Sequence, residues 1–233
     1  DLLEIIENTH SSIDEFQATG IIATQSFEEN LIHRAIQLVR RNFSIPALRI
    51  HLHKQIPFQA GLGGGSSNAV STISILNRLF KLNISSTTIH QMALELGSDC
   101  PFFIQAIPAR VGGRGEIVTP VNLNLSDKFI AIVKPLLSVK TSSAFQTIVP
   151  RVQSLPQLSS LQFNDFQTHL TNQFEESIGA QIPDILVIKK KLIEQGAFMA
   201  SLTGSGSAVY GLFHSMPKIS FSESYFIWIG KLQ

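Results

Sequence analysis

The sequence predicts an α+β protein, and three observations favour this class over a doubly wound parallel sheet or a disordered chain. Segments in which apolar and polar residues alternate, as they do in strands, lie irregularly between segments with a helical repeat of apolar residues. The chain has no internal repeat. Hydrophobic residues make up 44% and charged residues 15% of its 233 residues, so a folded protein with a sizeable core is expected.

The first elements follow from turn residues and apolar repeats. We expect strands over residues 1–7, 13–20 and 47–55, and a helix from Phe27 to about Asn42. Ser26 and Glu29 have the spacing of a capping box for that helix. In the third strand, Leu48, Ile50 and Leu52 alternate with polar residues and are expected to face the core.

A glycine-rich loop then leads directly into a helical pattern. Three consecutive glycines, Gly63 to Gly65, let a ligand approach the backbone closely, and Ser66 or Ser67 is expected to cap the helix. Backbone N–H groups and the positive end of the helix dipole then meet at one point, which predicts a phosphate site rather than a flexible linker. No Gly-Lys-Ser/Thr follows the glycines, so the loop is not a Walker loop, and its spacing does not fit Gly-x-Gly-x-x-Gly.

The rest of the chain continues the mixture of helices and strands. A helix from about Thr87 to Leu96 is expected to end at Gly97, and residues 98–104 are expected to form a polar corner that opens into an apolar strand. A second domain is expected to begin near residue 126. Further helices are expected around residues 142–148, 165–178 and 183–195, and further strands over residues 116–121, 129–133, 199–202, 208–213 and 225–229.

Composition excludes several classes of function. The formal net charge is +1 and there is no long basic run, so no electrostatic footprint for nucleic acid is present. Cys100 is the only cysteine, which excludes an internal disulfide and favours a reducing, cytoplasmic compartment. No apolar run has the length of a membrane span and no signal peptide precedes Asp1, so no membrane association is expected. The seven histidines show no paired metal-ligand spacing.

Three segments resemble the three motifs of the GHMP small-molecule kinases, namely Pro57–Ala69, Leu96–Phe103 and Leu202–Gly206. The fuller pattern Gly61-Leu62-Gly63-Gly64-Gly65-Ser66-Ser67-Asn68-Ala69, together with Gly97-Ser98-Asp99, is most similar to one branch of these enzymes. That branch is the family of 4-diphosphocytidyl-2-C-methyl-D-erythritol kinases, which belong to the non-mevalonate isoprenoid pathway.

The resemblance extends beyond the motifs. The segments Ser26–Ala35 and Leu137–Phe145 also match the family, so nearly the whole chain is covered. The fold that the resemblance implies has two halves. Residues 1–125 would form a ribosomal-protein-S5-like, ATP-binding half that lacks its first strand, and residues 126–233 a ferredoxin-like half, with the site between them.

The resemblance implies an ATP-dependent kinase for the 2-hydroxyl of 4-diphosphocytidyl-2-C-methyl-D-erythritol, a small-molecule substrate that contains a cytidine diphosphate. Mg²⁺ is implied as a cofactor beside ATP, with Ser67 as a candidate ligand and the metal site otherwise unknown. Asp99 is implied as the catalytic residue, because a carboxylate at this corner can accept the proton of the acceptor hydroxyl.

The implied ATP-binding residues lie in the glycine loop and at two earlier positions. They are Pro57, Phe58, Gln59, Ala60, Gly61, Leu62, Gly63, Gly64, Gly65, Ser66, Ser67, Asn30 and Lys54. The implied substrate-binding residues are Thr141, Phe145, Gly204, Ser205 and Gly206. The residues alone leave structural alternatives open: an exposed strand lysine for Lys54, a polar helix position for Asn30, a turn aspartate for Asp99, core packing for Phe145, and a simple turn for Gly204–Gly206.

In the family, a first strand with Pro-Ala-Lys-Ile/Val-Asn-Leu and a Gly-Tyr-His segment precede the part that Asp1 matches. A catalytic lysine and a substrate-binding histidine are therefore expected outside these 233 residues. By themselves the residues are then expected to be inactive, either as a fragment or as a defective protein. Two alternative functions stay open: another GHMP kinase, for homoserine, mevalonate or a sugar, and a catalytically defective nucleotide-binding relative. A monomer or weak homodimer is expected.

Overall fold

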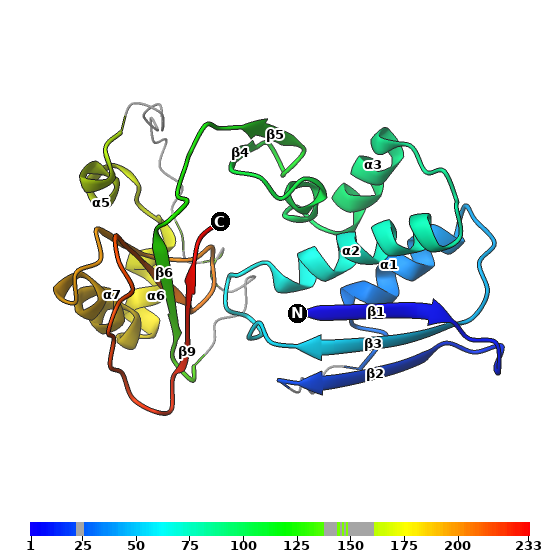
Figure 1. The fold of residues 1–233 in the computed structure, drawn as a ribbon, viewed down its shortest axis with the longest axis horizontal. Helices are drawn as coiled ribbons and strands as arrows, with labels where there is room; N and C mark the ends of the chain where they lie inside the picture. Colours follow the sequence, from blue (N-terminus) through cyan, green and yellow to red (C-terminus); the bar gives the residue numbers. More distant parts are fainter. Residues whose placement is uncertain (22–25, 138–143, 145, 147, 149–160) are drawn as a thin grey trace. The chain divides into compact units, whose positions relative to one another are not determined.

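The computed structural model describes residues 1–21, 26–137, 144, 146, 148 and 161–233, which divide into two compact units. The first unit contains Asp1–Phe58 and Gly63–Val121, and the second contains Gln59–Leu62 and Asn122–Gln233. Each unit combines helices with a β-sheet (Figure 1), so the predicted α+β class is confirmed. None of the helices in these residues is long and apolar enough to cross a membrane.

The first unit contains a three-stranded sheet of β1 (Leu2–Glu7), β2 (Glu15–Gly20) and β3 (Leu48–Lys54). The strand order is β1-β3-β2, with β1 antiparallel and β2 parallel to the central strand. Leu48 and Leu52 are buried on the inner face of β3, as the alternation of apolar and polar residues predicts.

Helices α1 (Leu31–Arg40) and α2 (Gly64–Leu79) lie over one face of this sheet (Figure 1), and α3 (Ser86–Leu96) packs beside them. The residues that form the core of this unit include Ile32, Ile36, Ile50, Ile73 and Leu76.

The capping box predicted for the first helix is wrong. Helix α1 begins at Leu31, and its N-cap is Asn30, whose Oδ1 accepts a 3.0 Å hydrogen bond from the backbone N–H of Ile32. Asparagine is among the best N-cap residues, because its side-chain oxygen pairs with an N–H that has no partner within the helix. Residues 27–30 therefore form a turn ahead of the helix.

The corner after α3 also differs from the prediction. Residues Cys100–Ile104 form a 3-10 helix, η1, instead of an apolar strand. Pro101 lies in its first turn, where the fixed φ of proline suits a helix and its missing N–H is not needed. The predicted hairpin follows as β4 (Ala109–Gly112) and β5 (Ile117–Pro120).

The second unit contains a four-stranded antiparallel sheet with the order β7-β8-β6-β9. Its strands are β6 (Phe129–Lys134), β7 (Met199–Leu202), β8 (Val209–Phe213) and β9 (Phe226–Lys231). Helices α6 (Phe174–Gln181) and α7 (Asp184–Glu194) pack on this sheet, and Ile178, Ile185 and Leu192 are fully buried there.

The helix predicted over residues 165–178 is interrupted. A short 3-10 helix η3 (Phe163–Asp165) continues into α5 (Phe166–His169), and α6 starts only at Phe174. Between them, Oδ1 of Asn172 accepts a hydrogen bond from the N–H of Phe174 at 2.9 Å. Such local side-chain bonds compete with helical ones, which explains the break.

Candidate active site

The glycine loop enters α2 through Gly63, which is the N-cap of the helix. Its backbone is left-handed, with φ 68° and ψ 12°, and a Cβ at this position would lie 2.5 Å from Cζ of Phe103. Both features require glycine. The helix therefore begins at Gly64, before the two serines, and the predicted serine N-cap is wrong. Ser66 and Ser67 lie in the first turn instead.

Because the N-cap is a glycine, no side chain caps α2. The first N–H groups of a helix have no acceptor within it and carry the positive end of its dipole. Gly64 and Gly65 belong to this first turn. Among the described residues, an added Cβ at Gly65 would meet only Leu31 Cδ1, at 3.6 Å, so its backbone is open on that side. This geometry suits an anion such as phosphate.

Lys54, the last residue of β3, is only 5% exposed. Its ammonium donates to the two carboxylate oxygens of Asp1 at 3.2 and 2.9 Å and to the carbonyl of Ile56, and it lies 4.8 Å from the centre of the Phe58 ring. Burial lowers the pKa of Lys54 to about 8, and the Asp1 carboxylate acts in the opposite direction by favouring the charged form. Lys54 is therefore no exposed strand lysine but an anchor for the start of the glycine loop.

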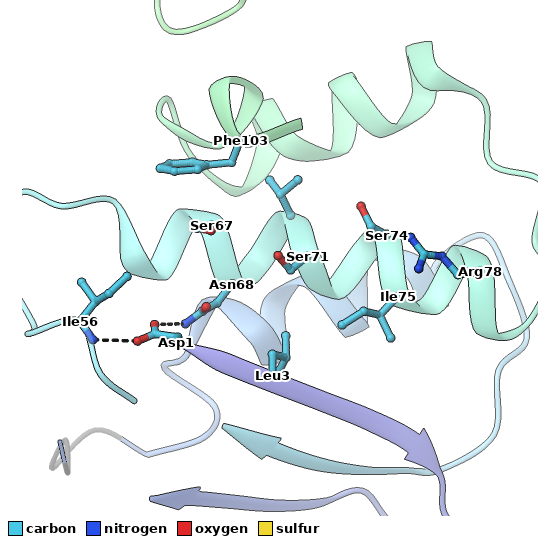
Figure 2. A pocket seen from close by; sticks show the side chains of 11 residues that line it. Asp1, Leu3, Ile56, Ser67, Asn68, Ser71, Ser74, Ile75, Arg78 and Phe103 are labelled. Atoms are coloured by element: carbon cyan, nitrogen blue, oxygen red, sulfur yellow. Dashed lines mark hydrogen bonds between the residues drawn. The ribbon is translucent and has the colours of Figure 1, made fainter. Parts of the chain in front are cut away.

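A cavity of about 340 Å³ is lined by residues of β1, α2 and η1, including Leu3, Asn68 and Phe103. Figure 2 shows the side chains that line it. Beside it, the Asp1 carboxylate accepts hydrogen bonds from Asn68 Nδ2 at 2.8 Å and from the N–H of Ile56 at 2.9 Å. The helical wall of the cavity is formed by Ser67, Asn68, Ser71, Ser74 and Arg78 among others. This polar wall includes Ser67, one of the residues predicted to bind ATP.

Asp99 is exposed at the N-cap of η1, and its carboxylate makes no capping hydrogen bond. The next residue, Cys100, is fully buried. Burial raises the pKa of the Cys100 thiol, a hydrogen bond with Ser66 opposes this, and the charge of Asp99 raises it further. The thiol therefore lies between the catalytic candidate and the first turn of α2, so these two predicted parts of the site are neighbours.

The hairpin turn supports the Asp99 corner. Gly115 has φ +109°, and a Cβ there would lie 1.7 Å from the carbonyl oxygen of Ser98. Only glycine allows the β4–β5 turn to approach the backbone this closely. The position of the corner thus depends on a packing contact as well as on the restricted backbone before Pro101.

Residues Gln59–Leu62 of the glycine loop belong to the second unit, where Ala60 and Gly61 form hydrogen bonds with the loop after β7. Thr203 Oγ1 donates to the Gly61 carbonyl at 2.7 Å, and the N–H of Ala208 donates to the Ala60 carbonyl at 3.2 Å. A Cβ on Gly206 would lie 2.0 Å from the Gly61 nitrogen. The two predicted glycine loops therefore contact each other, as expected from their lack of side chains.

Two predicted substrate-binding residues, Thr141 and Phe145, lie outside the described residues. Asn30 uses its Oδ1 to cap α1, so a structural role is sufficient to explain it. Asn172, which contacts the loop after β7, is not among the residues predicted from the sequence. The only sequence signal for Asn172 is an asparagine within a helical pattern, where this residue type is unfavourable.

Comparisons with known proteins agree with these motifs. The family profile of the GHMP kinases N terminal domain matches residues 30–106, and the profile of the GHMP kinases C terminal matches residues 154–221. A 4-diphosphocytidyl-2-C-methyl-D-erythritol kinase of Azobacteroides pseudotrichonymphae is 40% identical over 217 residues, which cover 91% of this chain and 81% of the relative. The enzyme of the same name from Parabacteroides distasonis is 37% identical over 238 residues, which cover 100% and 86%.

The chain belongs to the 4-diphosphocytidyl-2-C-methyl-D-erythritol kinase family of the GHMP kinases. A crystal structure of 4-(cytidine 5'-diphospho)-2C-methyl-D-erythritol kinase agrees, with a TM-score of 0.73 and 26% identity over 91% of this chain and 76% of that one. A homoserine kinase from Cytophaga hutchinsonii shares the fold, with a TM-score of 0.66 and 14% identity over 99% and 84%. The predicted two-domain GHMP kinase architecture is confirmed.

Proposed function

We propose that this GHMP kinase transfers the γ-phosphate of ATP to the 2-hydroxyl of 4-diphosphocytidyl-2-C-methyl-D-erythritol. In this reaction a bond forms between the hydroxyl oxygen and the γ-phosphorus, and the bond from that phosphorus to the bridging oxygen of ADP breaks. The hydroxyl proton passes to a base. The relatives with 37–40% identity that carry this name support the choice of substrate over homoserine, mevalonate or a sugar.

The single observation that carries the proposal is the glycine-opened start of α2. Gly63 turns the backbone with a positive φ, and the helix then begins without a side-chain cap. In this proposal the N–H groups of Gly64 and Gly65 bind phosphate oxygens with help from the helix dipole. Phosphoryl transfer depends mainly on such positioning and on charge stabilisation, so this loop would provide much of the catalysis.

We assign the role of base to Asp99. The alternative of an aspartate that caps η1 is not supported, because its carboxylate makes no capping bond. An exposed carboxylate that is not used by the helix is available for the acceptor hydroxyl. Its acceptance of the proton would orient the nucleophile, a contribution that is typically worth about 10²–10⁴ in rate.

Mg²⁺ accompanies ATP in this proposal. The described residues contain no group of three or more His, Cys, Asp or Glu side chains that could hold a metal ion by themselves. This fits magnesium in kinases, because Mg²⁺ keeps several waters and binds mainly through substrate phosphates with one or two protein ligands. The Ser67 hydroxyl, at the wall of the cavity and in the first turn of α2, is the proposed ligand. The bound ion would neutralise charge on the phosphates.

Three further expectations accompany the reaction, and they concern the substrate subsite, the compartment and the assembly of the protein. We propose that Phe145 stacks on the cytosine of the substrate and that Thr141 contributes to the same subsite, as the family resemblance implies. The cytoplasm is the proposed compartment, since the single cysteine suits a reducing environment. A monomer or weak homodimer remains the expectation for its assembly.

The test is transfer of ³²P from γ-labelled ATP by the full-length gene product, with 4-diphosphocytidyl-2-C-methyl-D-erythritol, homoserine and mevalonate as parallel acceptors. Labelling of the cytidine compound alone is the expected result. Phe145→Ala is expected to raise its KM by about tenfold or more with little effect on the KM of ATP, because stacking of a base on an aromatic ring is worth about 1–3 kcal/mol. Labelling of homoserine or mevalonate in its place would overturn the proposed substrate.

A further inference from the structure

Asn172 lies between α5 and α6 and contacts the loop that follows β7. Its Nδ2 donates to the carbonyl of Leu202 at 2.9 Å and to the carbonyl of Gly204 at 2.7 Å, and its Oδ1 accepts from the N–H of Phe174 at 2.9 Å. One side-chain amide therefore holds two carbonyls on either side of Thr203.

The orientation of this amide is determined by its partners. The two acceptors near Nδ2 are carbonyl oxygens and the donor near Oδ1 is a backbone N–H, so only one of the two amide orientations satisfies all three bonds. An aspartate at position 172 would keep the bond from Phe174 but would direct a carboxylate oxygen at two carbonyl oxygens. The substitution Asn172→Asp thus keeps the shape of the side chain almost unchanged, but it replaces two hydrogen bonds to the carbonyls of Leu202 and Gly204 with repulsion between oxygen atoms.

The residue before the loop is held as well. Glu175 Oε1 accepts from Ser201 Oγ at 2.8 Å and from the N–H of Leu202 at 2.9 Å, while Oε2 pairs with Lys189 at 2.5 Å. The end of β7 and the start of the loop are therefore fastened to one segment, which runs from Asn172 into the first turn of α6.

Thr203, whose two neighbours are held in this way, reaches the glycine loop. Its Oγ1 donates to the Gly61 carbonyl at 2.7 Å. The backbones are in close contact here, because a Cβ on Gly61, which has φ +74°, would lie 1.9 Å from the carbonyl oxygen of Thr203. Because this contact is between two backbones, with no flexible side chain between them, a displacement of Thr203 also displaces the backbone of Gly61.

We propose that Asn172 is a positioning residue for nucleotide binding, which holds the glycine loop in its binding conformation through Thr203. The inference rests on the proposed function, in which this loop binds the triphosphate. Asn172 touches no reacting atom in this scheme. It sets the position of Thr203, and the Thr203 hydroxyl sets the position of the Gly61 carbonyl, two residues before Gly63, the N-cap of α2.

Two readouts test the proposal on the purified full-length gene product and on its variants Asn172→Asp, Thr203→Val and Thr203→Ser. The first is the Kd of a non-hydrolysable ATP analogue with Mg²⁺, measured by calorimetry. The second is hydrogen–deuterium exchange of residues 59–62, which needs no ligand. Thr203→Val removes one hydrogen bond and is expected to raise the Kd about threefold to tenfold, whereas Thr203→Ser keeps the hydroxyl and stays within about twofold of wild type. Asn172→Asp is expected to raise the Kd about tenfold or more. Both Asn172→Asp and Thr203→Val are expected to increase the rate of hydrogen–deuterium exchange of residues 59–62.

Asn124→Asp is the matched control. Oδ1 of Asn124 accepts from the N–H of Ser126 at 2.8 Å, two residues ahead, as Oδ1 of Asn172 does from Phe174. A carboxylate keeps that bond, so neither the Kd nor the exchange of residues 59–62 is expected to change. This control separates the loss of the Asn172 Nδ2 bonds from the general effect of a new negative charge.

The two hypotheses fail in different ways. If Asn172→Asp leaves both the Kd and the exchange of the loop at wild-type values, the positioning role is wrong, even where the variant is less stable. If wild type does not bind the ATP analogue but exchange still rises in Asn172→Asp and Thr203→Val, the proposed function is wrong and the connection from Asn172 to the loop stands.

Discussion

Lys54 and Asp1 form a buried ion pair at the start of the glycine loop. The ammonium lies 2.9 Å from Asp1 Oδ2, and the two side chains are 5% and 3% exposed. The same carboxylate accepts from the N–H groups of Gln55 and Ile56, so it links the first strand to the segment that leads into the loop. Lys54 also donates to the carbonyl of Ile56, so the ion pair belongs to the hydrogen bonds that hold the segment ahead of the glycine loop.

The first prediction concerns pH. The folded-state pKa of Lys54 is about 8, below its ordinary value of 10.5, because burial disfavours the charge. Between these two values the unfolded chain holds more protons than the folded chain, so this group makes the free energy of unfolding rise with pH. Urea unfolding of wild type between about pH 8 and pH 10 is expected to show this contribution relative to Lys54→Arg, which does not titrate there. A fall relative to Lys54→Arg would mean that the Asp1 carboxylate outweighs burial.

The second prediction compares two glycines of the loop. Gly63→Ala places a Cβ in a left-handed conformation and 2.5 Å from Phe103 Cζ, so it is expected to lower the free energy of unfolding by more than about 1 kcal/mol. The new Cβ of Gly65→Ala contacts only Leu31 Cδ1, at 3.6 Å, in the part of the chain that the structure describes. It also lies within a helix, where alanine is favoured by about 0.5–1 kcal/mol. Urea unfolding of both variants gives the comparison. Equal effects of the two substitutions would contradict the assignment of Gly63 as the N-cap.

The third prediction tests Asp99. Because the side chain is exposed and makes no capping bond, Asp99→Asn is expected to leave the melting temperature and the Kd of ATP unchanged. In the full-length gene product, the kcat is expected to fall by about 10²–10⁴, as for loss of a general base. Asp127→Asn, another exposed aspartate, serves as the control and should retain wild-type kcat. Turnover of Asp99→Asn within a few-fold of wild type would show that Asp99 is structural.

The fourth prediction uses two buried serines of the second unit. Among the described residues the hydroxyl of Ser207 has no hydrogen-bond partner, whereas Ser201 Oγ donates to Glu175 Oε1 at 2.8 Å. Ser207→Ala removes an unsatisfied polar group, so it is expected to be neutral or to stabilise the fold by up to about 1 kcal/mol. Ser201→Ala removes a bond to a charged group and is expected to cost about 1.5–3 kcal/mol. Chemical unfolding of the pair measures both, and a large loss in Ser207→Ala would reveal a partner for its hydroxyl.

Much of the fold was predictable from local pattern. The alternation around Ile50 identified β3, and the apolar repeat that includes Ile73 and Leu76 identified α2. The repeat of Ile185, Ile188 and Leu192 identified α7. Each of these elements buries one face. The apolar residues of a buried face recur in the sequence with the period of the helix or strand, so the element can be identified from the sequence. The motifs that carry the family resemblance are local in the same sense.

The sequence by itself determined the family, the α+β class, most elements and the position of the glycine loop, since each depends on neighbouring residues. Only the tertiary structure decided where α2 begins, because the ring of Phe103, forty residues away, occupies the space of a Cβ on Gly63. It also decided that Lys54 is buried against Asp1, and that Asn172 holds the loop around Thr203. These contacts join residues far apart in the chain. The period of apolar residues identifies a helix or a strand, but it does not predict which side chain contacts which backbone group when two segments pack.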